Sequence, residues 1–159
     1  MRPHFALAAC LLLLAVTSAF ASESVRVVGV VDGDTIRVLR HGKQEIVRLH
    51  GIDAPERGQA FGRASARALG ALLRGRSADI EPTSTDRYGR TVALVHAGGD
   101  VINREIVRKG MAWVWPRYCT QEYCRDWSLD QDEARAARRG LWRGKSPVPP
   151  WEWRAVRRR

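Results

Sequence analysis

The sequence predicts a small α+β domain in which a β-barrel is capped by helices. Three short runs rich in β-branched residues come first, at about 25–31, 35–40 and 45–50, and helix-periodic segments alternate with further strands after them. The chain has 159 residues, enough for one domain with a hydrophobic core and too few for two. Early strands with helices interleaved later are typical of a barrel covered by helices.

The strands are expected to be short and half-buried. The first run is rich in valine, and the second and third alternate apolar with polar residues on either side of a glycine-containing turn. Two later strands are expected at 78–81 and 91–96, joined by a polar loop at 86–90.

Three helices are expected between and after these strands. The first is indicated by the near-helical spacing of Phe61, Ala64, Ala68 and Leu72, and Gly75 ends it.

The second helix should follow Asp100, a natural N-cap, and end at Gly110. The third should run over about 130–139, with Gly140 at its C-cap.

The C-terminal segment 145–159 has a different composition. It contains three prolines, a Trp-Glu-Trp sequence and a final run of three arginines, so we expect an extended strap with a basic tip. The chain has six tryptophans, and we assign most of them to packing, with stacking on nucleobases as the alternative.

The first 21 residues have the anatomy of a cleaved signal peptide. Arg2 is followed by an apolar run at 5–16 and by the small-x-small sequence Ala-Phe-Ala, with cleavage expected after Ala21. The apolar run is shorter than the roughly 20 residues that span a bilayer, so no transmembrane segment is expected in the mature chain. Cys10 also fits a lipidation site, but it precedes most of the apolar run instead of ending it.

Two cysteines remain after cleavage, Cys119 and Cys124. In an exported protein, periplasmic or secreted, a close pair favours a disulfide over a metal site, and no further Cys or His-rich partners complete a zinc tetrahedron.

The charge balance favours polyanionic partners. Removing Arg2 with the leader leaves 26 basic and 17 acidic side chains, a formal charge of +9. Nucleic acid is the first candidate and an anionic membrane or cell-wall polymer the second, although a merely soluble basic protein has the same balance.

Five residues in short motifs suggest a phosphodiesterase site. Asp34, Asp53 and Glu56 offer hard oxygen ligands for a divalent cation and a base for water. Arg48 and Arg90 offer planar forks that grip two phosphate oxygens. Phosphodiester hydrolysis uses a metal, a base and cations for the developing charge, so the set predicts a metal-dependent phosphodiesterase.

Each motif also has a structural interpretation. The Asp-Gly-Asp sequence at 32–34 could be a hairpin turn, and Asp32 could support Asp34 without contacting a metal. The segment 53–56 could cap a helix, Arg48 could make a structural ion pair, and Arg90 could be a solvated loop charge.

The chain resembles the thermonuclease family from about residue 27 to 142. The motifs that carry the resemblance occur in the order found in the family: Val-Asp-Gly-Asp-Thr, Arg-Leu-x-Gly-Ile-Asp-Ala-Pro-Glu, Asp-Arg-Tyr-Gly-Arg and Glu-Ala-x-Ala-x-x-x-Gly-Leu-Trp. The resemblance implies a five-stranded OB-fold barrel with three helices, in a nuclease domain at 22–144.

The resemblance also implies a role for each site residue. Asp34, Asp53 and the carbonyl of Ala54 would hold one Ca²⁺ ion, with Mg²⁺ the less expected choice. Glu56 would abstract a proton from the attacking water or order that water, and these two roles stay open. The remaining implied residues are the phosphate clamps Arg48 and Arg90 and the substrate contacts Arg87, Tyr88 and Tyr118.

Two features depart from the best-known member of the family. Pro116 takes the place of an active-site tyrosine, and the stretch 57–62 is shorter than the loop found there. The nucleotide pocket is therefore expected to differ in shape from the pocket of that protein, and base preference is left open.

The expected function is an exported, calcium-dependent nuclease acting on DNA and RNA and leaving 3′-phosphate ends. We expect a monomer without a stable protein partner. The alternative is a catalytically silent OB-type binder of nucleic acid or polyanion in the cell envelope. The presence of all five acidic and arginine residues favours the enzyme.

Overall fold

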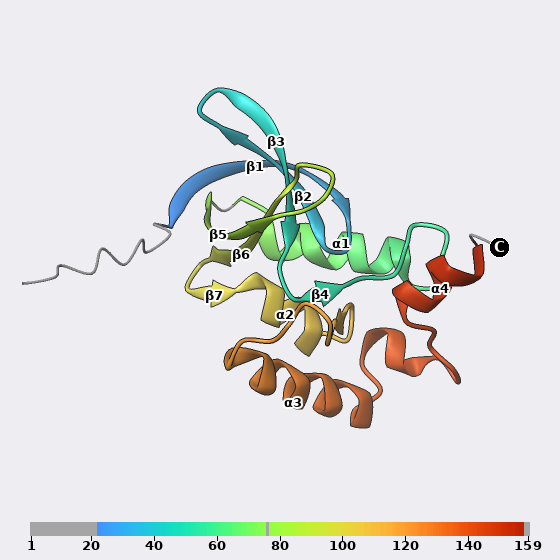
Figure 1. The fold of residues 1–159 in the computed structure, drawn as a ribbon. Coiled ribbons are helices and arrows are strands. Elements are labelled where there is room, and N and C mark those ends of the chain that lie inside the picture. Colours follow the sequence, from blue (N-terminus) through green and yellow to red (C-terminus); the bar gives the residue numbers. More distant parts are fainter. Residues whose placement is uncertain (1–21, 76, 158–159) are drawn as a thin grey trace, which may run out of the picture.

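A closed five-stranded barrel forms the centre of the molecule (Figure 1). The computed structural model describes residues 22–75 and 77–157. The barrel strands are β1 (Glu23–Asp32), β2 (Thr35–Arg40), β3 (Lys43–Leu49), β5 (Ser77–Thr85) and β6 (Thr91–Ala97). This architecture confirms the predicted α+β barrel.

The barrel closes through one parallel strand pair. β1 pairs antiparallel with β2 and β5, β2 with β3, and β5 with β6. β3 then meets β6 in parallel, with Arg48 opposite Val92. Two register shifts in β1, one of them just before Asp32, let this long strand bend around the barrel. Arg48 therefore lies at the closure of the barrel.

Two short strand pairs extend this frame. β7 (Asp100–Val101) pairs with the end of β6, and β4 (Ile52–Asp53) pairs with β8 (Trp113–Val114).

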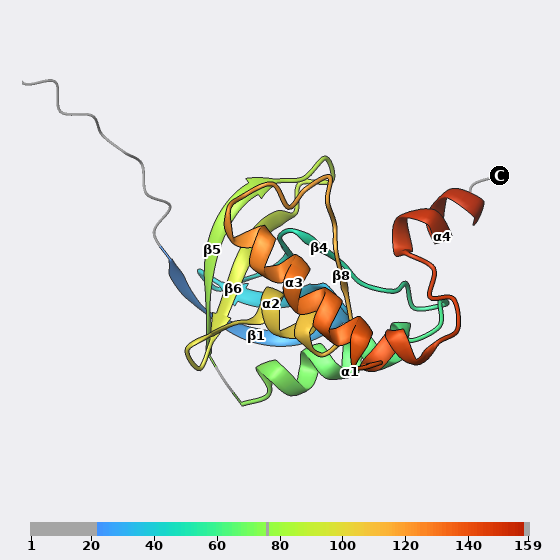
Figure 2. The same ribbon diagram turned by 90° about the horizontal axis from the view of Figure 1, so that it is seen from below.

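Four α-helices lie around the barrel in the part of the chain that the structure describes. They are α1 (Gly62–Leu73), α2 (Ile102–Arg108), α3 (Tyr123–Ala136) and α4 (Pro150–Arg157), with a 3₁₀ turn η1 (Gly140–Arg143) before the last. α1 packs along β1, and α2 lies between β6 and α3. In Figures 1 and 2, α4 stands at the side of the molecule, beside the segment that leads from β4 to α1.

The core joins the barrel interior to α1, α2 and α3 in one cluster. Its fully buried side chains include Ile36, Val38, Val47, Leu49, Leu69, Ile80, Val95, Ile102, Ile106 and Val107. A second cluster under η1 contains Trp113, Ala134, Leu141 and Trp142. Because the buried Val47 and Leu49 flank Arg48, and the buried Ile52 and Ala54 flank Asp53, core packing fixes the backbone that carries the site.

The predicted count of three helices was wrong, because the C-terminal strap ends in a fourth helix. The extended part stops at Pro149, whose carbonyl accepts the N–H groups of Glu152 and Trp153. Pro150 is the first helical residue, where its fixed φ and missing N–H are tolerated. The final residues, 158–159, lie outside the described residues.

Two predicted helix ends also differ. α2 begins at Ile102 without a side-chain cap, because Asp100 is taken up by β7. α3 begins at Tyr123, earlier than predicted, because Cys124 and Trp127 add a buried turn to its inner face.

Gly140 is not the C-cap of α3. Its φ is +51°, and a Cβ there would lie 2.2 Å from the carbonyl oxygen of Gly110. The glycine allows two backbone segments to touch.

The predicted disulfide between Cys119 and Cys124 is confirmed. It packs against the turn after β3, where Gly51 has a φ of +73° and a Cβ would lie 2.8 Å from Cys119 Sγ. The disulfide therefore stiffens the segment after β8 and packs it closely against the turn that follows the strand carrying Arg48.

The predicted signal peptide lies outside the described residues. Within 22–75 and 77–157, no helix is both long and apolar enough to cross a bilayer.

Candidate active site

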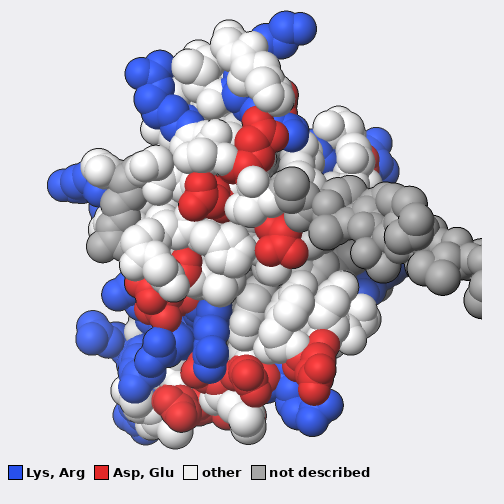
Figure 3. Space-filling model, turned by 90° about the vertical axis from the view of Figure 1, so that its left-hand side faces the viewer, with Lys and Arg blue, Asp and Glu red and all other residues white. Residues whose placement is uncertain are grey.

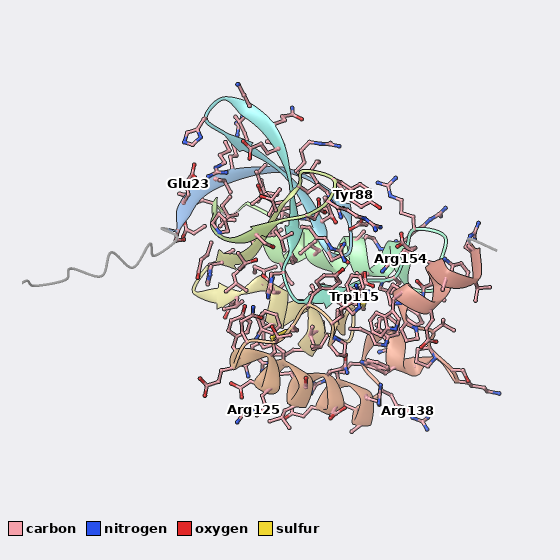
Figure 4. All side chains as sticks on the ribbon, in the orientation of Figure 1. Glu23, Tyr88, Trp115, Arg125, Arg138 and Arg154 are labelled. Atoms are coloured by element: carbon pink, nitrogen blue, oxygen red, sulfur yellow. A yellow bond between two sulfur atoms is a disulfide. The ribbon has the colours of Figure 1, made fainter. Side chains whose placement is uncertain are left out.

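Acidic side chains and arginines from five separate segments meet at one end of the barrel. The β1–β2 turn supplies Asp34, the end of β3 supplies Arg48, β4 supplies Asp53, and the segment before α1 supplies Glu56. The fifth segment, which sequence reasoning did not include, is α4, and it supplies Arg154. Figure 4 shows Arg154 and Trp115 on the side of the barrel that faces α4.

The β1–β2 turn places Asp34 by close packing. The Asp34 N–H donates to the Asp32 carboxylate at 3.1 Å, which is an Asx turn. A Cβ on Gly33 would lie 1.9 Å from Ser65 Oγ and 2.7 Å from the Ala54 Cβ, so only glycine fits between the turn and α1. The Leu49 N–H donates to the Asp34 carbonyl at 2.8 Å, which ties the turn to the end of β3.

Asp34 is almost fully buried, and both of its carboxylate oxygens accept hydrogen bonds. Oδ1 accepts from Arg48 Nη1 at 2.7 Å and from Thr35 Oγ1 at 2.9 Å. Oδ2 accepts from the backbone N–H of Ala54 at 2.7 Å. These three hydrogen bonds therefore hold the carboxylate in one orientation.

Arg48 bridges the two aspartates. Its Nη2 lies 3.0 Å from Asp53 Oδ1, and its guanidinium also lies 5.9 Å from the ring centroid of Trp115. Burial lowers the pKa of this guanidinium, but the Asp34 and Asp53 charges outweigh burial, so the pKa lies above its usual value. Arg48 therefore makes the ion pair of the structural interpretation, with two aspartates.

Asp53 is fully buried and contacts a second arginine. Arg154 Nη2 lies 2.6 Å from Asp53 Oδ2, and Arg154 Nη1 lies 3.1 Å from Oδ1. Burial raises the pKa of Asp53 above its usual range, although Arg154 and Arg48 act against this. Asp53 therefore needs cationic neighbours to remain charged.

The pKa is raised further at Asp32, which adjoins the site. Burial and the nearby Asp34 charge raise the pKa of Asp32 to about 7. Its carboxylate accepts the hydrogen bond from the Asp34 N–H, so Asp32 supports the turn that carries Asp34.

Glu56 is the most accessible acid of the group. Its side chain is 41% exposed, and Oε1 accepts from Arg154 Nη1 at 2.8 Å. Its backbone is fixed more firmly, because its N–H donates to Gln59 Oε1 and a Cβ on Gly62 would lie 1.9 Å from its carbonyl oxygen. Glu56 therefore combines a fixed backbone with a carboxylate that water can reach.

Arg90 does not join this cluster in the structure. Its Nε donates to Asp86 Oδ2 at 2.6 Å, and its guanidinium lies 5.5 Å from the ring centroid of Tyr88. Arg90 directly precedes Thr91, which pairs with Val47 beside Arg48. The register therefore brings its backbone to the same end of the barrel while its side chain faces its own loop.

The predicted substrate contacts are exposed aromatic and basic side chains. Tyr88 is 66% exposed, and its hydroxyl accepts from Arg87 Nη2 at 2.7 Å. Tyr118 is half exposed and lies edge-on to Trp115, with ring centroids 4.4 Å apart.

Sequence reasoning missed Arg154 and the tryptophans that hold it. Trp115 and Trp151 stack with an interplanar angle of 9°, and the Arg154 guanidinium lies 5.3 Å from the Trp115 centroid. The signal available was the Trp-Glu-Trp-Arg sequence, in which two aromatics and a cation lie on one short segment.

The donor chemistry of the cluster fits a hard divalent cation. Asp34 and Asp53 supply carboxylate oxygens, and Ala54 adds a carbonyl. No group of three His, Cys, Asp or Glu side chains in the described ranges could hold a metal by itself. A cation held by these two carboxylates would need the backbone carbonyl and water to complete its coordination.

A comparison with known protein families identifies the family of this chain. Residues 46–144 match the family described as staphylococcal nuclease homologue. The chain belongs to this family. The matched range contains Arg48, Asp53, Glu56 and Arg90, whereas Asp34 and Arg154 lie outside it on either side.

Relatives extend the match toward both ends. A protein of Escherichia coli O157:H7 named "uncharacterized endonuclease" is 43% identical over 130 residues, covering 81% of this chain and 83% of the relative. A protein of Haemophilus influenzae with the same name is 38% identical over 93% of this chain and 83% of its own length. A Shigella flexneri protein named "micrococcal nuclease" is 37% identical over 94% of this chain and 90% of its own length. The predicted membership of a thermonuclease-like family is confirmed.

Proposed function

We propose that this chain is an exported, metal-dependent endonuclease that hydrolyses phosphodiester bonds in DNA and RNA, with Ca²⁺ as its ion. The observation that carries the proposal is the continuous network from Asp34 through Arg48 to Asp53 and on to Glu56. It supplies ion ligands, a cation and a water-accessible base at one end of the barrel. Family membership and relatives named as nucleases support the same activity.

The two aspartates and the Ala54 carbonyl would hold the ion. A bound divalent cation supplies positive charge against a nonbridging phosphate oxygen. Calcium is preferred over magnesium on family resemblance, since carboxylate and carbonyl oxygens suit both ions.

Glu56 is assigned to the attacking water. Its carboxylate is partly exposed, so a water can hydrogen-bond to it, and it either takes the proton or orients the water for in-line attack. Its backbone contacts with Gln59 and Gly62 fix the segment that carries it.

The arginines are assigned to the phosphate. Arg48 is pre-oriented by two carboxylates, and its charge can be shared with phosphate oxygens as negative charge builds up on phosphorus. Arg90 would have to turn away from Asp86 to do the same. The expected products carry 3′-phosphate ends.

Export is supported by two features. The first 21 residues have the pattern of a signal peptide, and the Cys119–Cys124 disulfide is typical of an oxidising compartment such as the periplasm or the medium.

The positive net charge of the mature chain favours binding of nucleic acid. The distribution of charged side chains over the surface indicates where the nucleic acid binds. On the face seen in Figure 3, acidic side chains lie among the basic ones, so the described residues form no continuous basic surface there. We assign nucleic-acid binding to the end of the barrel that carries Arg48.

The test is cleavage by the purified mature chain, residues 22–159. Plasmid DNA and RNA are incubated with calcium, with magnesium and with a chelator, beside Glu56→Gln as the control. We expect calcium-dependent cleavage of both substrates, stopped by chelation and strongly reduced in the control. Nucleic-acid binding without cleavage in every condition would instead support the silent polyanion binder.

A further inference from the structure

The Arg154 guanidinium bonds the Asp53 oxygens that a metal ion at this site would use. It bonds both oxygens of Asp53 and one oxygen of Glu56, at distances between 2.6 and 3.1 Å. With Arg48 also on Oδ1, both oxygens of Asp53 already accept hydrogen bonds from arginine. In this state, Asp53 has two cationic partners within the chain itself.

Arg154 reaches Asp53 from the far end of the sequence, on a helix that is lightly attached. Pro150 is the buried residue of α4, and the other described positions of this eight-residue helix are half-buried or exposed. A helix this short has little stability of its own, so its place depends on its tertiary contacts.

Those contacts come from a small set of side chains, among which Trp151 packs against the hydrophobic cluster under η1. Trp151 stacks on Trp115, Arg154 lies against the same ring, and Gln59 Nε2 donates to the Val148 carbonyl at 2.5 Å. A cavity of about 160 Å³ lies between the strap and the body of the protein, and Trp153 is part of its lining. An incompletely packed strap can detach from the body of the protein while the barrel core stays folded.

We propose that Arg154 and the metal ion compete for Asp53, so that α4 is a latch whose release is coupled to metal binding. The inference rests on the proposed function, because it takes Asp53 as a ligand of the ion. With the latch closed, Arg154 neutralises Asp53 and fixes Glu56. With the latch open, Arg48 still bonds Asp53 Oδ1, while Asp53 Oδ2 becomes available to the ion and the Glu56 carboxylate to water.

The competition has a defined thermodynamic consequence. A ligand that binds only the open state has its apparent affinity reduced by the fraction of molecules that are open. Coupling between two binding events in proteins is commonly about 5- to 150-fold. Removing the latch should therefore tighten metal binding, whereas removal of an ordinary supporting residue should leave it unchanged or weaken it.

The first test is calorimetric titration of the mature chain with CaCl₂. Arg154→Ala is compared with the wild type and with Arg157→Ala, which removes the same charge from the same helix but from a side chain that lies against Trp153. We expect Arg154→Ala to bind calcium about 5-fold or more tightly. Arg157→Ala should stay within about twofold, which excludes a general effect of helix charge.

The second test needs no variant. Calcium should change the tryptophan fluorescence of the wild type as the Trp115–Trp151 stack opens, and it should speed proteolytic cutting in the strap at 145–149. Equal or weaker calcium binding by Arg154→Ala, or an unchanged strap when calcium is bound, would overturn the latch. Calcium binding with strap release but no cleavage of nucleic acid would leave the latch standing and defeat the proposed function instead.

Discussion

At the scale of single residues, the three acids of the site lie in different surroundings. Asp34 is held by Arg48, Thr35 and a backbone N–H, while Asp53 is held by two arginines. Glu56 is the one of the three whose side chain is substantially exposed. Buried, paired carboxylates suit a fixed ion, and an exposed carboxylate on a fixed backbone suits proton transfer with water.

This difference predicts opposite outcomes for two isosteric changes. Glu56→Gln should bind calcium nearly as the wild type does, while its turnover falls by roughly 10²–10⁴-fold, the usual effect of losing a general base. Asp34→Asn removes a formal charge from the ion site and should weaken calcium binding. Calcium calorimetry and single-turnover cleavage measure the two effects, and loss of calcium binding in Glu56→Gln with retention in Asp34→Asn would reverse the role assignment.

The two arginines should also respond differently. Arg48→Lys and Arg90→Lys both lose a bidentate fork, so each should lower kcat far more than it raises KM. Only Arg48 bridges two buried aspartates, so Arg48→Ala should in addition cost about 3–5 kcal/mol of unfolding free energy. Urea denaturation checks this, with Arg90→Ala as the control expected to cost about 1 kcal/mol or less.

At the scale of elements, the loop between β5 and β6 is organised by Asp86. Burial raises the pKa of this carboxyl, but hydrogen bonds from the Arg90 N–H, the Arg90 side chain and the Tyr88 N–H outweigh it, and the pKa lies below its usual value. A lowered pKa means that the ionised form stabilises the folded loop.

The sign of this shift gives a pH prediction. The loop stabilisation should be fully present above the unfolded value of about 4 and be lost as the pH falls through the lower, folded pKa. Carboxyl chemical shifts followed by NMR should show Asp86 titrating below the ordinary value of an aspartate. In Arg90→Ala the Asp86 pKa should rise toward its ordinary value, and an unchanged pKa would show that Arg90 does not hold this carboxylate.

The start of α1 offers a second test at this scale. Gly62→Ala would place a Cβ 1.9 Å from the Glu56 carbonyl oxygen, so the segment that carries Glu56 must move. We expect a cost of about 1–3 kcal/mol and a fall in turnover. Gly70→Ala in the same helix meets its nearest atom at 3.7 Å and should stabilise the protein by about 0.5–1 kcal/mol with turnover unchanged. Similar behaviour of the two variants would show that the Gly62 contact does not position Glu56.

At the scale of the whole molecule, the sequence predicted the barrel and most of the site, because those features depend on local patterns. Valine-rich alternation marks the strands, and Asp34, Arg48, Asp53 and Glu56 each lie in a short recognisable motif. The structure brings these four together as expected. The orientation of Arg90 was not predictable, because it depends on which of two partners, Asp86 or a phosphate, its side chain meets.

The C-terminal segment could not be predicted for a similar reason. Its helix is held by the stacking of Trp151 on Trp115 and by the ion pair of Arg154 with Asp53. The residues of these two pairs are 36 and 101 positions apart in the chain. Composition indicated only a proline-rich strap with a basic tip. Long-range contacts of this kind override local propensity, and the hydrophobic periodicity of a single sequence does not predict them.

The attachment of α2 to the barrel, called the joint below, depends on one buried side-chain amide. Asn103, at the start of α2, accepts the Val95 N–H at 2.9 Å and donates to the carbonyls of His50 and Ala93 at 3.0 and 3.1 Å. These bonds fasten α2 to β6 and to the turn after β3, just beyond the parallel pair that closes the barrel. The closure involves few residue pairs, so a fully buried side chain that spans both strands should contribute heavily to global stability.

Asn103→Ala should therefore lower the unfolding free energy by about 3 kcal/mol or more, because it leaves a buried N–H and two buried carbonyls with fewer partners. Arg104→Ala on the same helix removes the half-exposed partner of the buried Asp130, which keeps Arg108 Nε at 3.8 Å, and it should cost only about 1 kcal/mol. Urea denaturation measures both, and an unchanged m-value would show that the same folded and unfolded states are being compared. None of the Asn103 bonds reaches the acidic cluster, so turnover of the folded Asn103→Ala fraction should match the wild type at low temperature. A large loss of turnover with little loss of stability would mean that the joint orients Arg48 through the end of β3 instead of holding the barrel closed.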